Sequence, residues 1–253
     1  MQKIDFTVVT VSYNAEETIK QTIDSVLSQK DVIIEYLVID GASQDNTISI
    51  LQCVKDERFS YISEPDNGLY DAMNKGIRKA KGKYVAILNS DDVYIDSTVL
   101  CNVKNIFEEK ESDIVSGHIY YFKDDFRKVG RRYKCSSHHN RKSWELGFQP
   151  PHPATFVKKN VYDEIGCYKT NFKISADYEF LLRALYINSY KLNVLEKYVV
   201  AMRQGGESTS SISSYKQGNK EVLKAWKVNK KNPPNLLIIS KILRKVFGAI
   251  KGK

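Results

Sequence analysis

The first 95 residues alternate between apolar, β-branched runs and segments in which apolar residues recur three or four positions apart. The runs FTVVTVSY (6–13), IIEYLVID (33–40), FSYISE (59–64) and YVAILN (84–89) predict four buried strands. The segment 69–80 predicts a helix that stops at Gly82. Asn14 and Glu17 resemble a capping box at the start of an earlier helix. This alternation predicts a parallel sheet with helices on both faces.

The pattern changes after residue 95. Asp96 is expected to cap a helix, and residues 113–134 predict an antiparallel pair joined by a turn at 123–125. The segment 142–159 reads as irregular because it holds three of the six prolines. A helix near 175–188 and a strand near 192–202 are expected to follow. We therefore expect a nucleotide-binding half over 1–95 and an acceptor half over 96–212.

Composition limits the class of protein. The 253 residues are 42% hydrophobic and 27% charged, as in a soluble globular protein, and four cysteines form no C-x-x-C pair. The start does not resemble a signal peptide, and no run of 18 apolar residues occurs. These features predict a cytoplasmic protein.

The net charge of +9 is concentrated at one end of the chain. Residues 214–253 hold eleven Lys/Arg and one acid, a balance of +10, whereas the remainder holds 28 basic and 29 acidic residues, a balance of −1. We expect residues 213–253 to be a basic helical extension. Within 235–253, apolar residues from Ile239 to Ile250 share one helical face opposite lysines and arginines, the pattern of an interfacial helix on anionic lipid. The alternative is a helix packed on the protein body; Pro233-Pro234 favours a detached segment.

Polar residues follow all four predicted strands. They are Ser12-Tyr13-Asn14, Asp40-Gly41, Glu64-Pro65-Asp66-Asn67-Gly68 and Ser90-Asp91-Asp92. Turns are commonly polar, but ligands of parallel sheets bind beyond these strand ends, so we expect the four to converge on one crevice.

The adjacent carboxylates of Asp91 and Asp92 at a strand end need a positive partner. The sequence lacks G-x-G-x-x-G after the first strand, G-x-x-x-x-G-K-[ST], G-x-S-x-G and H-E-x-x-H. Mg²⁺ or Mn²⁺ held by one or two carboxylates and by ligand phosphates explains the pair. The sequence therefore predicts a metal ion bound together with a nucleotide diphosphate.

Four blocks, VTVSYNAEETI, VIDGASQDNT, DNGLYDAMNKGIRKAKGKYVAILNSDD and ISADYEFLLR, resemble glycosyltransferase family 2 in order and spacing over residues 6–207. The resemblance implies an α/β GT-A fold: a Rossmann-like, mostly parallel central sheet with helices on both faces, a smaller antiparallel acceptor-side part, and C-terminal helices. It also implies inverting sugar transfer.

The resemblance assigns the nucleotide side. Val11 and Ser12 lie where the family's first strand passes beneath the nucleoside, and Asp40 matches the carboxylate that hydrogen-bonds the base. A short acceptor there suits a pyrimidine edge, which favours UDP, although dTDP presents the same edge. The other nucleotide-binding candidates at this rim are Asn14, Asn67 and Gly68.

The resemblance also assigns the metal motif. Asp92 matches the last position of the family's D-x-D-like motif and would bind the cation, and Asp91 would contact the ribose or metal-bound water. Ser90 replaces the first carboxylate, which makes this an S-D-D version.

Asp177 in SADYEF matches the family's catalytic base, although Ala176 stands where the family often has Glu. Such a base takes the proton of the attacking hydroxyl. The alternative is a first-turn residue that complements the helix dipole.

Other positions are weaker acceptor or closing-loop candidates. His152 could face the acceptor, and the segment 203–208, with Gly205, Gly206 and Glu207, resembles the family's closing segment over the diphosphate. A structural histidine and a simple turn are the alternatives. The basic hairpin 127–134 could touch an anionic acceptor, but a solvated face explains it as well.

The expected function is metal-dependent transfer of a sugar from a nucleotide sugar to a lipid-linked saccharide at the inner membrane face. The basic tail and the habits of the resembled family indicate the lipid-linked acceptor. The absence of the Q-x-x-R-W motif of processive synthases indicates one sugar per acceptor. The alternatives are an inactive relative or basic-tailed binder of membrane or nucleic acid, and a sugar-phosphate nucleotidyltransferase. The near-neutral body and the lack of nucleic-acid-binding motifs argue against nucleic acid. The sequence does not indicate an oligomeric state.

Overall fold

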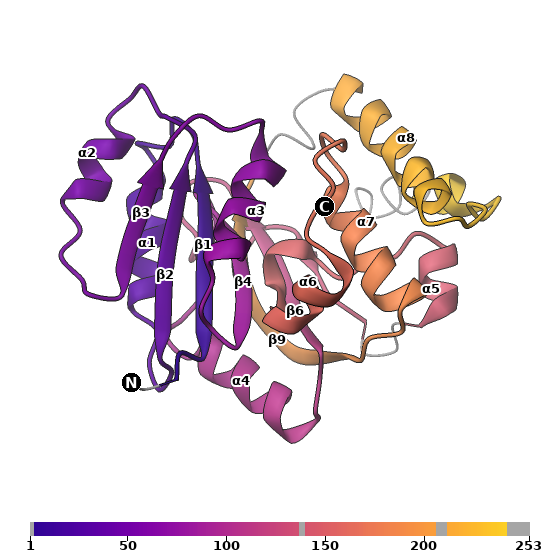
Figure 1. The fold of residues 1–253 in the computed structure, drawn as a ribbon, viewed down its shortest axis with the longest axis horizontal. Helices are drawn as coiled ribbons and strands as arrows, with labels where there is room; N and C mark the ends of the chain where they lie inside the picture. The colour runs from indigo at the N-terminus through magenta and orange to yellow at the C-terminus, as the bar shows by residue number, and fades with distance from the viewer. Residues whose placement is uncertain (1–2, 137–139, 206–211, 242–253) are drawn as a thin grey trace.

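The computed structural model describes residues 3–136, 140–205 and 212–241, and Figure 1 shows their arrangement. Within these ranges a nine-stranded sheet has the order β3-β2-β1-β4-β8-β6-β9-β5, with β7 paired to β6. The strands are β1 (Phe6–Ser12), β2 (Ile34–Asp40), β3 (Phe59–Ser63), β4 (Tyr84–Asn89), β5 (Val93–Tyr94), β6 (Ile114–Phe122), β7 (Arg132–Tyr133), β8 (Thr155–Lys158) and β9 (Leu192–Arg203).

Helices cover both faces of this sheet. They are α1 (Ile19–Leu27), α2 (Thr47–Gln52), α3 (Leu69–Lys79), α4 (Val99–Glu109), α5 (Arg141–Glu145), α6 (Lys159–Ile165), α7 (Ala176–Leu181) and α8 (Ile212–Val228), with a 3₁₀ turn, η1 (His152–Ala154), and a π-helical continuation of α7, η2 (Leu182–Ile187). The predicted α/β architecture is confirmed.

The four predicted strands are confirmed and run parallel as β3-β2-β1-β4. The register aligns Ser12 with Asp40 and Asp40 with Ser63, while Val11 lies opposite Asn89. The polar ends of the strands therefore meet at one edge, where the sequence predicts the site.

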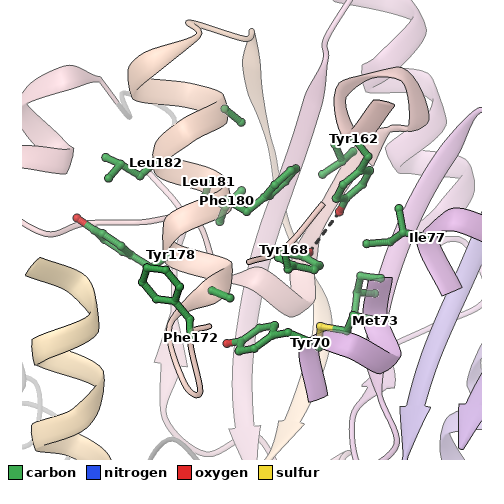
Figure 2. Close-up of a cluster of buried hydrophobic side chains, with 14 of the residues drawn as sticks. Tyr70, Met73, Ile77, Tyr162, Tyr168, Phe172, Tyr178, Phe180, Leu181 and Leu182 are labelled. Atoms are coloured by element: carbon green, nitrogen blue, oxygen red, sulfur yellow. Dashed lines mark hydrogen bonds between the residues drawn. The ribbon is translucent and has the colours of Figure 1, made fainter. Parts of the chain in front are cut away.

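Successive residues of each strand point to opposite faces, which divides the core in two. Val9 and Val11 join a cluster with α3, α6, α7 and α8, whereas Phe6 and Val8 join one with α1, α2 and α4. Figure 2 shows part of the first cluster, which holds Tyr70 from α3 and Tyr178 from α7, and the Tyr70 hydroxyl donates to the Ile174 carbonyl just before α7. Packing on this face thus joins the helix after β3 to the helix that carries Asp177.

The second half differs from the prediction in two ways. The β6–β7 pair is antiparallel as expected, but β7 has only two residues. Residues 142–159 are not wholly irregular, because α5, η1 and β8 lie there. Strand β8 pairs antiparallel with both β4 and β6 and so joins the two halves. Its four residues follow three closely spaced prolines, too short a run for an apolar pattern to identify.

The predicted helix starts are also corrected. Helix α1 begins at Ile19, and Asn14, with φ +48°, does not cap it. The Asn14 N–H instead donates to Ser43 Oγ at 2.8 Å, and its Oδ1 accepts from Gln44 N–H at 2.8 Å. The Asn14 side chain and N–H therefore bond to the loop after β2, and so the side chain does not cap α1. Asp96 accepts from the Thr98 N–H before α4 and is not the cap residue either.

The C-terminal region packs on the body. Val222, Ala225 and Trp226 of α8 are buried in the same cluster as α3 and α7, and Leu237 is fully buried there too. In Figure 1, α8 lies alongside α7. The expected detachment after Pro233-Pro234 is therefore wrong for residues 237–241; residues 242–253 lie outside the described residues. No helix among the described residues is both long and apolar enough to cross a bilayer. The division of the chain at residues 95 and 212 stays a prediction.

Candidate active site

A cleft of about 1210 Å³ opens at the carboxyl ends of β1 and β4. It brings together residues from both halves of the chain. The sequence-predicted residues that line it are Val11, Ser12, Asn14, Gly68, Ser90, Asp91, Asp92, His152, Asp177 and Gly205. Asp40 and Asn67 do not line it, and Gly206 and Glu207 lie outside the described residues. The predicted convergence of strand ends is thus found for most of the candidates.

Asp92 lies at the floor of the cleft and is 1% exposed. Its Oδ1 accepts from the Arg203 N–H at 3.2 Å, and its Oδ2 accepts from Asn89 Nδ2 at 3.2 Å. The Thr22 hydroxyl donates to the Asp92 carbonyl at 2.8 Å, which fixes the turn from α1. The carboxylate is therefore held in place by two long hydrogen bonds that leave acceptor capacity on both oxygens.

Two neighbouring carboxyls at this point disfavour ionisation. Burial raises the pKa of Asp92 well above its ordinary value, and the charge of Asp91 raises it further. Burial also raises the pKa of Asp91, which the Arg203 charge opposes in part. A cation bound at this position would favour the ionised form of both.

Arg203, at the end of β9, is the cationic side chain whose charge lowers the pKa of both Asp91 and Asp92 and so opposes the effect of burial. Its guanidinium donates to the Lys123 carbonyl and to Gln21 Oε1, each at 3.1 Å, and lies 4.7 Å from the centre of the Phe122 ring. Its Nε is buried without a hydrogen-bond partner among the described residues. The backbone of Arg203, the first residue of the predicted closing segment, also donates a hydrogen bond to the Asp92 carboxylate.

The residues present fit a hard divalent cation that shares its ligands with a diphosphate. In the described part of the chain, no group of three or more His, Cys, Asp or Glu side chains is arranged to hold an ion. The chain offers Asp91 and Asp92, and Asn89 Oδ1 beside them is buried without a partner in the described ranges. One or two carboxylates with substrate phosphates completing the shell is the usual arrangement for Mg²⁺.

Asp40 lies behind the cleft and is fully buried. Its Oδ1 accepts from Ser12 Oγ at 3.0 Å and from Ser43 Oγ at 2.5 Å; its Oδ2 accepts from the Ser43 N–H and from Ser63 Oγ. Asp66 does line the cleft, with its carboxylate against Gly41. Asp40 therefore organises the ends of β1, β2 and β3, and its contact with a base stays a prediction.

Asp177 lies in the first turn of α7 and lines the same cleft. The Tyr70 hydroxyl lies 3.3 Å from its Oδ1, but is closer to the Ile174 carbonyl, at 2.6 Å. Gln149 Nε2 donates to Oδ2 at a long 3.4 Å. Because neither contact is strong, the carboxylate keeps lone pairs with which to accept a proton. Burial and the Asp177 charge raise the pKa of Tyr70, which keeps that hydroxyl protonated.

His152 lines the cleft and is held by Tyr168, whose hydroxyl lies 2.8 Å from its Nε2. Burial lowers the pKa of His152, and the Asp177 charge offsets this only in part. The imidazole is therefore neutral near pH 7. It lines the cleft and is also held in place by its hydrogen bond with Tyr168.

Sequence reasoning missed several cleft residues. Asn89 precedes the S-D-D triplet and Tyr70 lies inside a quoted block, so the resemblance covered both without singling them out. Gln149 and Lys173 carry no local signal, because only the fold brings them to Asp177 or the cleft.

Comparison with known proteins identifies the family. The family described as Glycosyl transferase family 2 matches residues 7–176. The chain belongs to glycosyltransferase family 2. An uncharacterized glycosyltransferase of Mycobacterium tuberculosis is 33% identical over 180 residues, which cover 70% of this chain and 67% of that protein. The Escherichia coli UDP-Glc:alpha-D-GlcNAc-diphosphoundecaprenol beta-1,3-glucosyltransferase WfaP is 33% identical over 124 residues, 49% of each chain.

Solved structures establish the GT-A fold of this family-2 chain. TarS 1-349 of S. aureus in complex with UDP-GlcNAc superimposes with a TM-score of 0.67 and 19% identity, covering 88% of this chain and 66% of that one. The mannosyltransferase PcManGT of Pyrobaculum calidifontis, in complex with GDP-Man and Mn²⁺, gives a TM-score of 0.65 at 18% identity, covering 95% of this chain and 69% of that one. The predicted family and fold, with a mostly parallel mixed sheet, are confirmed.

Proposed function

We propose that this chain is a metal-dependent, inverting glycosyltransferase that moves one sugar from a UDP-sugar to a hydroxyl of a lipid-linked saccharide. The observation that carries the proposal is a single cleft lined both by Asp91 and Asp92, which follow β4, and by the weakly engaged Asp177 in the first turn of α7. A donor bound in this cleft would have its diphosphate at Asp91 and Asp92 and its anomeric carbon toward Asp177.

The nucleotide side of the cleft is formed by strand ends. Val11 and Ser12 would lie beneath the nucleoside, and Asp91 would reach the ribose or a metal-bound water. Asp92, with Asn89 Oδ1 beside it, would hold Mn²⁺ or Mg²⁺, and Asp91 would contact this ion only through its bound water. When bound, the cation would neutralise the charge that develops on the departing diphosphate.

Asp177 would act as the general base. It would accept the proton of the acceptor hydroxyl as that oxygen attacks the anomeric carbon from the face opposite the nucleotide. Attack from this face inverts the anomeric configuration. The neutral His152 and the Arg131 and Lys173 side chains that also line the cleft would face the acceptor.

The names of relatives support the proposed substrates. The WfaP name specifies a UDP-glucose donor and an acceptor linked to diphosphoundecaprenol, and several mycobacterial relatives at 26% identity are named PGL/p-HBAD biosynthesis glycosyltransferases. The TarS structure holds UDP-GlcNAc, and the PcManGT structure holds GDP-Man and Mn²⁺. Two of these three named donors are UDP-sugars, so the names favour UDP, together with a divalent cation and an acceptor used in surface-glycan assembly.

Labelled UDP-glucose and UDP-GlcNAc, incubated with the protein, Mn²⁺ and a polyprenyl-diphosphate-linked GlcNAc, test this proposal. Transfer of label to the lipid, or slow release of free sugar, is the expected result. Pyrophosphate-dependent formation of UTP would instead indicate a nucleotidyltransferase. Neither product, despite nucleotide binding, would indicate an inactive relative.

We also propose that the C-terminal segment contacts the anionic inner face of the cell membrane. Leu236 and Ile239 are 59% and 55% exposed, while Leu237 is buried and Lys241 Nζ lies 5.5 Å from the centre of the Tyr178 ring. The side of this segment that faces the protein is therefore distinct from its exposed apolar side. In the sequence, Ile242, Leu243 and Val246 follow Ile239 at helical spacing and continue the apolar pattern.

Removal of residues 242–253 is expected to abolish binding to vesicles that contain phosphatidylglycerol. The change deletes four cationic residues and five large apolar or aromatic residues from the end of the basic extension, and it leaves Leu237, which is buried in the core. Flotation of the full and shortened chains with anionic and phosphatidylcholine vesicles measures this. The pair Leu236→Gln and Ile239→Gln should weaken binding in the full chain. Equal flotation of all forms would contradict the proposal.

A further inference from the structure

Glu221, the one acidic residue in the basic C-terminal extension, points into the body beneath the catalytic side of the cleft. The residue is 3% exposed. Its carboxylate accepts hydrogen bonds from three backbone N–H groups, those of Lys173, Ile174 and Ser175, each at 2.9 Å. Gln217, one turn earlier on α8, donates to Oε1 at 2.8 Å. Three of the four hydrogen bonds that Glu221 accepts thus come from the turn before α7.

This turn connects Glu221 with the proposed base. Lys173 and Ile174 line the cleft, and Asp177 follows two residues after Ser175. The Ile174 carbonyl accepts from the Tyr70 hydroxyl that also approaches Asp177. A shift of the turn would therefore move both the start of α7 and the hydrogen bond of Tyr70.

Further contacts hold α8 against the same helix. Ser175 Oγ donates to the Gly218 carbonyl at 3.2 Å, and Trp226 Nε1 donates to the Tyr178 hydroxyl at 2.9 Å. A Cβ atom at Gly218 would lie 3.4 Å from Ile174 Cγ2, so α8 approaches the turn closely. The neighbours of Asp177 on both sides are thus fixed by one helix.

The charge of Glu221 suits this position. Burial alone would raise the pKa of its carboxyl, but the hydrogen bonds from the turn and from Gln217 outweigh burial and hold the pKa below its ordinary value. The ionised carboxylate is the form that accepts all four donors.

We infer that Glu221 is a positioning residue for Asp177, and that the C-terminal helix α8 is therefore a working part of the catalytic site. The inference rests on the proposed role of Asp177 as base. Helix α8 lies beyond the family match, which ends at residue 176. The residue that orients the base thus comes from the basic extension 213–253, which the sequence alone does not connect with the catalytic site.

Glu221→Gln tests the inference in the full chain. Glutamine keeps the size of the side chain but replaces one acceptor oxygen by an NH₂ group, so at least one backbone N–H of the turn loses its partner. We expect kcat for UDP release to fall about tenfold to 10²-fold, because misplacement of a catalytic group is costly. The donor KM and the UDP Kd should stay within about twofold, which a general loss of structure would not allow.

Lys224→Met is the matched control on the same helix. Lys224 donates to the Asn171 carbonyl at 2.6 Å and lies 4.4 Å from the centre of the Phe172 ring, just before the turn. It should keep kcat within about twofold of the unchanged protein. Equal losses in both variants would indicate a structural role for Glu221 and overturn the inference.

A double variant separates the inference from the proposed function. In the Asp177→Asn background, Glu221→Gln should cause no further loss of turnover, because both changes act through the same group. A normal kcat for Glu221→Gln beside an inactive Asp177→Asn would overturn the inference alone. Full activity of Asp177→Asn would remove the proposed base and the inference with it. If Glu221→Gln does not fold, Glu221→Asp decides: reduced kcat with unchanged UDP Kd supports positioning, and unchanged kcat refutes it.

Discussion

Asp177→Asn is expected to lower kcat by about 10²–10⁴ while leaving the UDP Kd and its metal dependence unchanged, since this is the usual contribution of a positioned general base. Asparagine keeps the size of the side chain and can still contact Gln149 and Tyr70, but it has no basic oxygen to take a proton. Donor binding should survive because the nucleotide-side residues lie at the ends of β1 and β4, whereas Asp177 lies on α7.

Two assays are needed to measure this effect. Turnover is followed as UDP release with lipid-linked acceptor, and UDP binding is followed by calorimetry with Mn²⁺. Asp163→Asn, at an exposed carboxylate on α6, is the matched control and should retain both. If Asp177→Asn loses nucleotide binding together with turnover, Asp177 belongs to the donor site and is not the base.

Asp92→Asn is expected to have two opposite effects: loss of metal-dependent UDP binding, by about 10²-fold or more given the loss of the carboxylate ligand, and higher thermal stability of the metal-free protein. The stability gain follows from removal of a buried carboxylate that lies beside another one. Asn89, whose Oδ1 has no partner among the described residues, can turn to accept from the new amide. A gain of about 1 kcal/mol would raise the melting temperature by roughly 2–4 °C in a chain of this size.

The stability gain should depend on pH. Because burial raises the pKa of Asp92, the folded protein holds this proton more tightly than the unfolded chain does. The free energy of unfolding of the unchanged protein therefore falls as pH rises from the ordinary carboxyl range to the raised value. Asparagine does not titrate, so the difference in melting temperature should be small in acid and grow toward neutral pH. Melting curves in EDTA from pH 4 to pH 8 measure this, and a difference that shrinks as pH rises would contradict the account.

The parallel half of the fold is predictable because its strands are buried on both sides. Residues such as Val8 and Val9 alternate between two apolar clusters, so the whole run is hydrophobic and visible in the sequence. Strand β8 was missed because it is short and follows prolines. The Asn14 cap failed because the loop after β2, distant in sequence, supplies better partners for its backbone and side chain.

The candidate site was only partly predictable for the same reason. The family blocks identify Asp92 and Asp177, but not their surroundings. Arg203 reaches Asp92 across 111 residues, and Tyr70 reaches Asp177 across 107. No local pattern contains such contacts. The C-terminal segment shows the converse: its apolar residues indicate an amphipathic helix, yet only packing reveals that Leu237 faces the core.

Crystals grown with UDP and Mn²⁺ test the central claim most directly, because the anomalous signal of manganese locates the ion without reference to the protein chain. The account predicts one strong peak within about 2.0–2.6 Å of an Asp92 carboxylate oxygen and of a diphosphate oxygen, the range of hard-cation ligands. It also predicts that Asp177 lines the same cleft beyond the diphosphate. A manganese peak elsewhere, or UDP bound with its phosphates away from Asp92, would contradict it.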